Sequence, residues 1–229
     1  KCLVFVDQHR LTGVYLDLNQ NSKRDTGDRF GYSFINYGGD ILGYMVSACT
    51  DILERDENGI PSFTVADSKR TADFVNDFIT IASNDGASVG LTSAETVLQE
   101  FTEGKSLIGD YQRLGSLERL ILRDMQDEMG VLPLPMLYAS DRKYVTSAHD
   151  TTEVGAILAT SRDLDYISTV VEVLNRETAR ILIPQYYSLS LQIKYVNDPY
   201  SSEMVGIIHD NFGSAFLLAY NNACGSVIT

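Results

Sequence analysis

The residues with the clearest chemistry lie in one acidic loop, at positions 17–28. Within this twelve-residue stretch, oxygen-bearing side chains occupy loop positions 1, 3, 5, 9 and 12. Hard oxygen ligands at this spacing wrap around a calcium ion, and position 7 adds a backbone carbonyl. The predicted metal ligands are therefore Asp17, Asn19, Asn21, Asp25 and Asp28, with the carbonyl of Lys23.

Two positions of this loop depart from the calcium-binding consensus. Ser22 stands where a glycine normally makes the sharp turn, and Asp28 stands where a longer Glu binds the ion through both oxygens. Lys23 and Arg24 also dilute the local negative charge. The alternative interpretation is a turn that is closed by hydrogen bonds from its own Asp and Asn side chains.

Composition narrows the possible classes of protein. The net charge is −13, and the 18 Lys and Arg residues are scattered along the chain. This excludes the basic face that nucleic acids or anionic membranes require. No apolar stretch is long enough to span a bilayer, and the first residues are not a complete signal peptide. The three cysteines, at positions 2, 49 and 224, form no C-x-x-C pair, so no zinc or redox site is predicted.

The sequence offers no recognisable catalytic motif. It has no Gly-x-Ser-x-Gly elbow, no His-Glu-x-x-His pair and no phosphate-binding glycine loop. His149, Asp150 and Glu153 would be the acid–base set of an enzyme, but adjacency in sequence supplies no catalytic geometry. We therefore predict that the chain is not an enzyme. A fragment of a glycoside hydrolase acting through two carboxylates remains the less favoured alternative.

Helices and short strands alternate along the first half of the chain. Asn58-Gly59 favours a tight turn before a short strand at 61–65. Asp67 or Ser68 is expected to cap the helix that follows. The apolar stripe of that helix consists of Phe74, Val75, Phe78 and Ile79.

A second capped helix leads into another strand. Ser93 is the predicted cap, Glu95 and Glu100 are expected to face water, and a brief strand is predicted at 105–110. The residues of this helix that are expected to point inward are Val97, Leu98 and Phe101.

The second half of the chain is predicted to be mostly helical. One helix starts at Ser116 and ends before Gly130, with Ile121 facing inward. Residues 154–158 form a short buried strand, and a long helix starts at Asp163 or Asp165. A last helical segment is predicted near 201–209. The overall pattern is mixed α/β with a helical majority.

Four passages resemble, in the same order, segments of the family 1 extracellular solute-binding proteins, the ligand-capturing components of ABC importers. Together they cover most of the chain, from about residue 13 to about residue 210. The passages are Tyr15–Tyr32 with its aspartate loop and Phe-Gly-Tyr end, Phe101–Lys105, Arg123–Pro135 with its Val-Leu-Pro-Leu-Pro end, and Pro184–Tyr195.

The resemblance implies a fold as well as a role. It implies an α/β, helix-rich, periplasmic-binding-protein-like (type II) fold, in which two lobes close over a ligand. Residues 1–110 would form mainly the carboxy-terminal-type lobe, 111–160 a crossover that adds strands to the other lobe, and 161–229 a helical return. Nothing in this chain matches the first half of the amino-terminal lobe, so we expect a fragment with a partly built cleft.

Three polar segments would face the cleft by this resemblance. The first lies before a predicted helix, and its alternative role is capping of that helix by Asp40. The second follows a predicted strand around Tyr111, and its alternative role is a surface connector. The third lies between two apolar segments near residue 150, and its alternative role is a solvated turn. The predicted ligand-binding residues are Asn36, Tyr37, Asp40, Tyr111, Arg113, His149, Asp150 and Thr151.

A carbohydrate is the ligand class that the resemblance favours. The chain has no Trp for stacking on a sugar, although it has 13 Tyr and 9 Phe. The family further implies ABC permease subunits as partners and an extracellular lipoprotein location, with a lipid anchor outside this chain. Apart from a structural calcium ion, no cofactor is expected. A calcium-dependent carbohydrate-binding or adhesion module of a surface protein is the main alternative, although the helical majority disfavours it.

Overall fold

The fold was analysed in a computed structural model of the chain. It describes residues 15–35, 38–50, 52–65, 68–84, 87–88, 91–110, 113–125, 127–148, 155–188 and 198–213.

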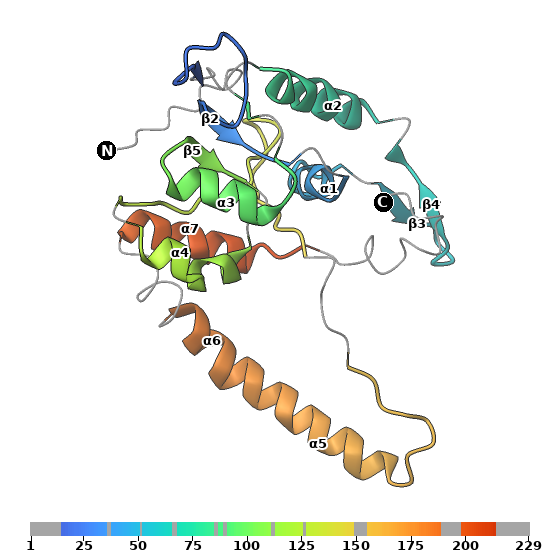
Figure 1. The fold of residues 1–229 in the computed structure, drawn as a ribbon. Coiled ribbons are helices and arrows are strands. Elements are labelled where there is room, and N and C mark those ends of the chain that lie inside the picture. The colour runs from blue at the N-terminus through green and yellow to red at the C-terminus, as the bar shows by residue number, and fades with distance from the viewer. Residues whose placement is uncertain are drawn as a thin grey trace.

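A three-stranded sheet of order β1–β2–β5 lies at the centre of the fold (Figure 1). β1 (Tyr15–Leu16) pairs antiparallel with β2 (Arg29–Ser33), and the acidic loop connects these two strands. β2 pairs in parallel with β5 (Ser106–Gly109), which confirms the strand predicted at 105–110. Phe30 and Tyr32 are buried on β2, and because they are two residues apart they lie on the same face of the strand.

A separate hairpin confirms the predicted tight turn. β3 (Leu53–Arg55) pairs antiparallel with β4 (Pro61–Phe63). The turn between them needs a positive φ, and Gly59 supplies it with a value of 79°. Asp56 Oδ1 accepts the amides of Asn58 at 2.9 Å and Ile60 at 2.8 Å, so the Asp side chain closes the turn.

Helices make up most of the remaining structure. Two predicted caps are confirmed, since the hydroxyl of Ser68 accepts the amide of Thr71 and Ser93 forms a capping box with Thr96. The helices are α1 (Gly38–Ser47), α2 (Lys69–Ala82), α3 (Ala94–Thr102), the 3-10 turn Leu114–Glu118, α4 (Leu120–Arg123), α5 (Leu164–Glu177), α6 (Ile183–Gln185) and α7 (Pro199–Asp210).

Two apolar clusters place the helices on opposite faces of the sheet. On one face, Tyr32 and Phe34 pack with Tyr44 of α1 and Phe78 of α2. On the other face, α3 approaches β5 closely, because a Cβ atom at Gly109 would lie 3.3 Å from Phe101 Cβ. Behind α3 a second cluster joins it to α4 and α7, through Leu98, Leu117, Leu122 and Val205.

A long helix extends away from this body (Figure 1). α5 continues through a π-helical turn at Thr178–Leu182 into α6, so Pro184 falls within one helical run. Asp163 is its N-cap residue, as predicted. Its large apolar side chains are largely exposed, and Leu174 and Leu182 each retain 61% of their accessible surface. Over the described part of the chain, no helix combines the length and apolar character needed to cross a membrane.

Two predictions of side-chain orientation are wrong. Glu100 does not face water: its side chain is buried beneath the end of α3, with its Oε1 atom 3.8 Å from Lys105 Nζ. Burial raises the pKa of Glu100, and the Lys105 ammonium opposes this shift. Val75 and Ile79 are exposed, because α2 packs on the core only along the side of the helix that carries Phe74 and Phe78.

Two predictions of secondary structure in the second half are also wrong. The helix expected from Ser116 is broken into the 3-10 turn and the four-residue α4, and Ile121 is exposed at 41%. Residues 155–158 form no strand and are exposed, with Leu158 at 74%. These residues lead to the projecting helix, and none of the described strands pairs with them. The predicted helix near 201–209 is confirmed as α7.

Candidate functional site

The first half of the acidic loop is organised by Asp17. Its Oδ1 atom accepts the amide of Asn21 at 3.3 Å, and its Oδ2 atom accepts the amide of Ser22 at 2.8 Å. Ser22 takes a φ of 60°, so the sixth position makes the left-handed turn that the consensus assigns to glycine. The loop therefore turns as a calcium-binding loop does at this point, despite the serine.

Asp25 is held by the two asparagines of the loop. Its Oδ1 atom accepts from Asn19 Nδ2 at 3.1 Å, and its Oδ2 atom accepts from Asn21 Nδ2 at 2.7 Å. The amide of Gly27 also donates to Oδ1 at 2.8 Å. These hydrogen bonds lower the pKa of Asp25 below its ordinary value, and the bond from Asn21 has the largest effect.

Asp28 closes the loop from the inside. Its side chain is fully buried, at 0% exposure, and accepts the amides of Leu18 at 3.2 Å and Asp25 at 3.1 Å. The hydroxyl of Tyr15 lies 3.2 Å from both Asp28 Oδ2 and the carbonyl oxygen of Lys23. The oxygens at loop positions 7 and 12 thus converge on one tyrosine hydroxyl.

The loop fits the predicted calcium site in part. The chain folds all five predicted side chains and the Lys23 carbonyl into one compact turn, and their oxygens accept hydrogen bonds from loop amides and from Tyr15. Among the described residues, no group of three or more His, Cys, Asp or Glu side chains is arranged to hold a metal ion. The alternative interpretation, a turn closed by its own side chains, describes this geometry, and calcium binding stays a prediction.

Three parallel segments lie side by side at the carboxyl end of β2, the end that is opposite the acidic loop. The register pairs Tyr32 with Ile108 and Ser33 with Gly109, and the amide of Asp110 donates to the carbonyl of Ser33 at 2.9 Å. A short third segment, 87–88, bridges in parallel to Tyr32, and its Ser88 amide donates to the Tyr32 carbonyl at 2.8 Å. Open α/β sheets bind ligands at such carboxyl ends.

Two of the three predicted ligand-binding segments begin at this edge. Asn36 and Tyr37 follow β2 in sequence, and Tyr111 follows β5, but all three lie outside the described residues, as do His149, Asp150 and Thr151. Arg113 is described and exposed; it is the N-cap residue of the 3-10 turn. α1 begins at Gly38, so Asp40 lies inside its first turn, and the alternative role of Asp40 as N-cap is wrong.

A polar cluster beneath this edge was not predicted from sequence. Asp110 Oδ2 accepts hydrogen bonds from Tyr32 Oη and Tyr44 Oη, both at 2.6 Å, and the two hydroxyls also contact each other. Burial, followed by the charge of Asp110, raises the pKa of Tyr32 well above its ordinary value. The cluster joins β2, α1 and β5, and no sequence signal indicated it, because its members are far apart in the chain.

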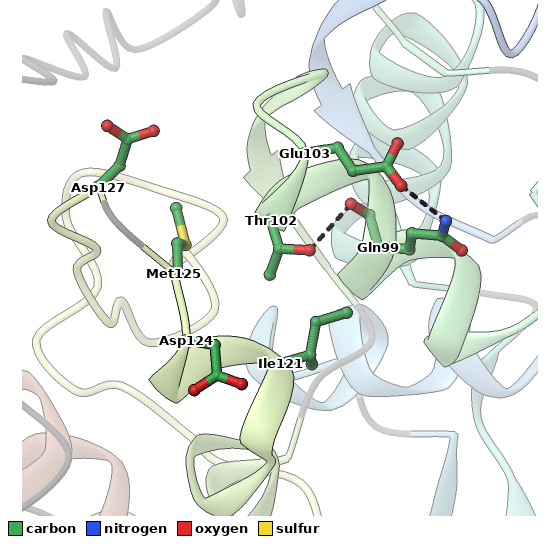
Figure 2. A pocket seen from close by; sticks show the side chains of 7 residues that line it. All are labelled: Gln99, Thr102, Glu103, Ile121, Asp124, Met125 and Asp127. Carbon is green, nitrogen blue, oxygen red and sulfur yellow. Dashed lines mark hydrogen bonds between the residues drawn. The ribbon is translucent and has the colours of Figure 1, made fainter.

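The described pocket lies at the opposite end of the sheet. It has a volume of about 610 Å³ and is lined by the end of α3 and the segment around α4 (Figure 2). Glu103 contacts Gln99 Nε2 at 2.7 Å and Lys105 Nζ at 2.9 Å. Because α3 ends where β5 begins, this pocket is remote from the carboxyl edge. It is open and acidic, with Asp124 and Asp127 on its other side.

Comparison of the chain with protein-family models, with curated proteins and with solved structures found no match.

Proposed function

We propose that this chain is part of an extracytoplasmic solute-binding protein, which captures a small solute, with a carbohydrate favoured, and delivers it to an ABC importer. The observation that supports the proposal is the register of β2 and β5 at one sheet edge, from which the chain leads in sequence to two of the predicted ligand-binding segments. The chain leaves β2 after Ser33 and β5 after Gly109, and these two residues are paired in register. Segments far apart in sequence therefore start from neighbouring points.

This edge has the physical properties that a solute site needs. Helix N-termini present unpaired backbone amides, which bind the oxygen atoms of ligands. α1 begins shortly after β2, so its N-terminus follows this edge directly in the chain. Polar residue types at the start of these connections would orient hydroxyl groups, while the tyrosines provide apolar faces.

The rest of the proposal follows from the resemblance of the four ordered passages. The partners would be ABC permease subunits, and the protein would be an extracellular lipoprotein. Residues 1–110 would contribute most of one lobe, and 111–160 with 161–229 would cross to the other lobe and return. A calcium ion in the acidic loop would be structural, held by Asp17, Asn19, Asn21, Lys23, Asp25 and Asp28. No catalytic step is assigned.

A ligand screen on the complete protein tests the proposal. Melting temperature would be measured with monosaccharides, oligosaccharides, peptides and amino acids, because a ligand that binds only the folded state raises it. We expect at least one carbohydrate to raise the melting temperature. The alternative of a glycosidase would be supported, and the proposal refuted, if no compound shifts melting while a sugar substrate is hydrolysed.

Two matched arginine variants localise the site. Arg113 precedes the 3-10 turn that follows β5 in the chain, whereas Arg180 lies on the projecting helix and pairs with Glu177 at 2.6 Å. Both side chains are exposed, so either change to Ala should have little effect on folding. We expect Arg113→Ala to weaken the ligand response and Arg180→Ala to preserve it. Equal responses in both variants would place the ligand elsewhere.

A further inference from the structure

Resting on the function proposed above, we propose that Tyr32, Tyr44 and Asp110 form a positioning network that sets the two ligand-binding segments at the sheet edge relative to each other. None of these residues is among the predicted ligand contacts. Their role would be to fix the backbone from which those contacts project.

One carboxylate oxygen holds the network together. Asp110 Oδ2 accepts both tyrosine hydroxyls at 2.6 Å, and the hydroxyls contact each other. Hydrogen bonds to a charged acceptor are shorter and stronger than neutral ones. Tyr32 lies on β2, Tyr44 on α1 and Asp110 directly after β5, so three elements meet at one atom.

The network acts where both segments start. Asp110 is attached twice to the β2 side of the edge: its backbone amide donates to the Ser33 carbonyl at 2.9 Å, and its side chain accepts from Tyr32. The bond to Tyr44 adds α1, which begins directly after the first segment. A shift of Asp110 would therefore move the start of the second segment relative to both the end of β2 and α1.

The surroundings make the network rigid. Tyr32 is 7% exposed and stacks on Phe34 with a centroid distance of 5.4 Å, while the Tyr44 ring lies 5.7 Å from that of Phe78. Within this apolar cluster, polar bonds are strengthened by the low local dielectric. The hydroxyl of Tyr32 is protonated at physiological pH, as that of an ordinary tyrosine is, and its raised pKa favours this donor form further. Because Tyr32 is buried, it acts on a ligand only through other residues.

A tyrosine elsewhere in the chain provides a matched control. Tyr138 Oη donates to Asp73 Oδ2 at 2.6 Å, the same length and chemistry as the bond from Tyr44 to Asp110. Both tyrosines are partly buried, and Tyr138 joins α2 to the turn at 138–141, away from the sheet edge. Changing either tyrosine to Phe removes one hydroxyl and keeps the ring.

The experiment compares sugar affinity, by calorimetry on the complete protein, in Tyr44→Phe, Tyr138→Phe and wild type. We expect both variants to lose a similar amount of thermal stability. Tyr44→Phe should bind the best sugar of the screen about 10-fold more weakly, a loss of one hydrogen bond, whereas Tyr138→Phe should bind it as wild type does. Hydrogen exchange at the Asp110 amide should accelerate only in Tyr44→Phe, relative to the change in global stability.

The other results each overturn the proposal. Wild-type affinity in Tyr44→Phe would refute it while leaving the solute-binding function intact, and so would an equal loss in both variants, which would indicate a general effect of stability. A wild-type protein that binds no sugar and no other solute of the screen would refute the proposed function and this inference with it.

A further variant, Asp110→Asn, keeps an acceptor oxygen but removes the charge. Its sugar affinity should lie between those of wild type and Tyr44→Phe.

Discussion

Replacement of Asp28 by Asn is the sharpest test of the acidic loop. Asp28 is completely buried, and its two oxygens accept three hydrogen bonds, from the amides of Leu18 and Asp25 and from the Tyr15 hydroxyl. The amide of Asn has the same shape but only one acceptor oxygen. Whichever way it is oriented, its NH2 group faces at least one N–H or O–H donor.

The expected cost follows from these bonds. With its oxygen on the Oδ2 side, the introduced carboxamide would keep two donors as neutral hydrogen bonds and leave the Leu18 amide without an acceptor. Bonds to charged groups contribute roughly 1.5–3 kcal/mol each and neutral ones about 1 kcal/mol. At the low end of these values, the exchange of three charged bonds for two neutral ones should lower the unfolding free energy by about 2.5 kcal/mol. For a domain of this size that corresponds to a decrease of about 5–10 °C in melting temperature.

An exposed aspartate serves as the control. Asp56 also accepts two backbone amides, those of Asn58 and Ile60, but both bond to Oδ1 and the side chain is in water. Asp56→Asn keeps that oxygen and should cost about 0.5 kcal/mol or less. Urea denaturation of the three proteins measures the difference. If Asp28→Asn is as stable as Asp56→Asn, the buried carboxylate does not organise the loop and our reasoning is wrong.

Three further predictions concern metal, pH and surface. Calcium should raise the melting temperature more than magnesium does, by about 2.7 kcal/mol of stability at a hundred times its Kd, and identical melting with calcium and with chelator would refute a site in 17–28. The hydrogen bond from Arg70 lowers the pKa of Asp141 below its ordinary value, so its contribution to stability is complete above the ordinary pKa of an Asp and is lost as the pH falls through the lowered pKa; Asp141→Asn should therefore destabilise the protein more at pH 7 than at pH 3, and an equal loss at both would contradict this. Replacing the exposed Leu174 and Leu182 by Gln should reduce dye binding to the apolar face of residues 164–188 without lowering the melting temperature, and a marked loss of stability would show that these side chains are packed.

Local chemistry made some elements predictable. Ser68 and Ser93 cap α2 and α3 because a short hydroxyl side chain satisfies amides only a few residues away. Asn58-Gly59 makes its turn because Gly59 accepts a positive φ without strain. Each of these features depends on neighbours in sequence, so single-sequence reasoning was sufficient.

The spacing of apolar residues indicated which face of a helix is apolar, but not which element covers that face. The stripe of α2 was identified, but Val75 and Ile79 are exposed, since the sheet covers only the side with Phe74 and Phe78. Glu100 was expected in water because it is charged, yet Lys105, the residue before β5, pairs with it under the helix end. Such partners come from tertiary packing, which the pattern of one helix does not contain.

The candidate site divides in the same way. The acidic loop was visible because its polar residues lie within one short stretch. The carboxyl edge depends on the register of Ser33 against Gly109, and the cluster of Tyr32, Tyr44 and Asp110 depends on that register and on the position of α1. Neither the register nor the docking of α1 is encoded at any fixed spacing, so the cluster could be found only in the fold.

The parallel pairing of β2 with β5 also has a consequence for how the protein is made. Phe30 pairs with Ser106, and α1, the β3–β4 hairpin, α2 and α3 lie between them in sequence. Contacts of such long range slow folding, because a long stretch of chain must be closed before they form. At a synthesis rate of about 5–20 residues per second, β5 follows β2 from the ribosome by roughly 4 to 15 s. During that time the edge of β2 that later pairs with β5 has no partner strand, although β1 on the other edge is already made, and we expect a chaperone to hold the nascent chain.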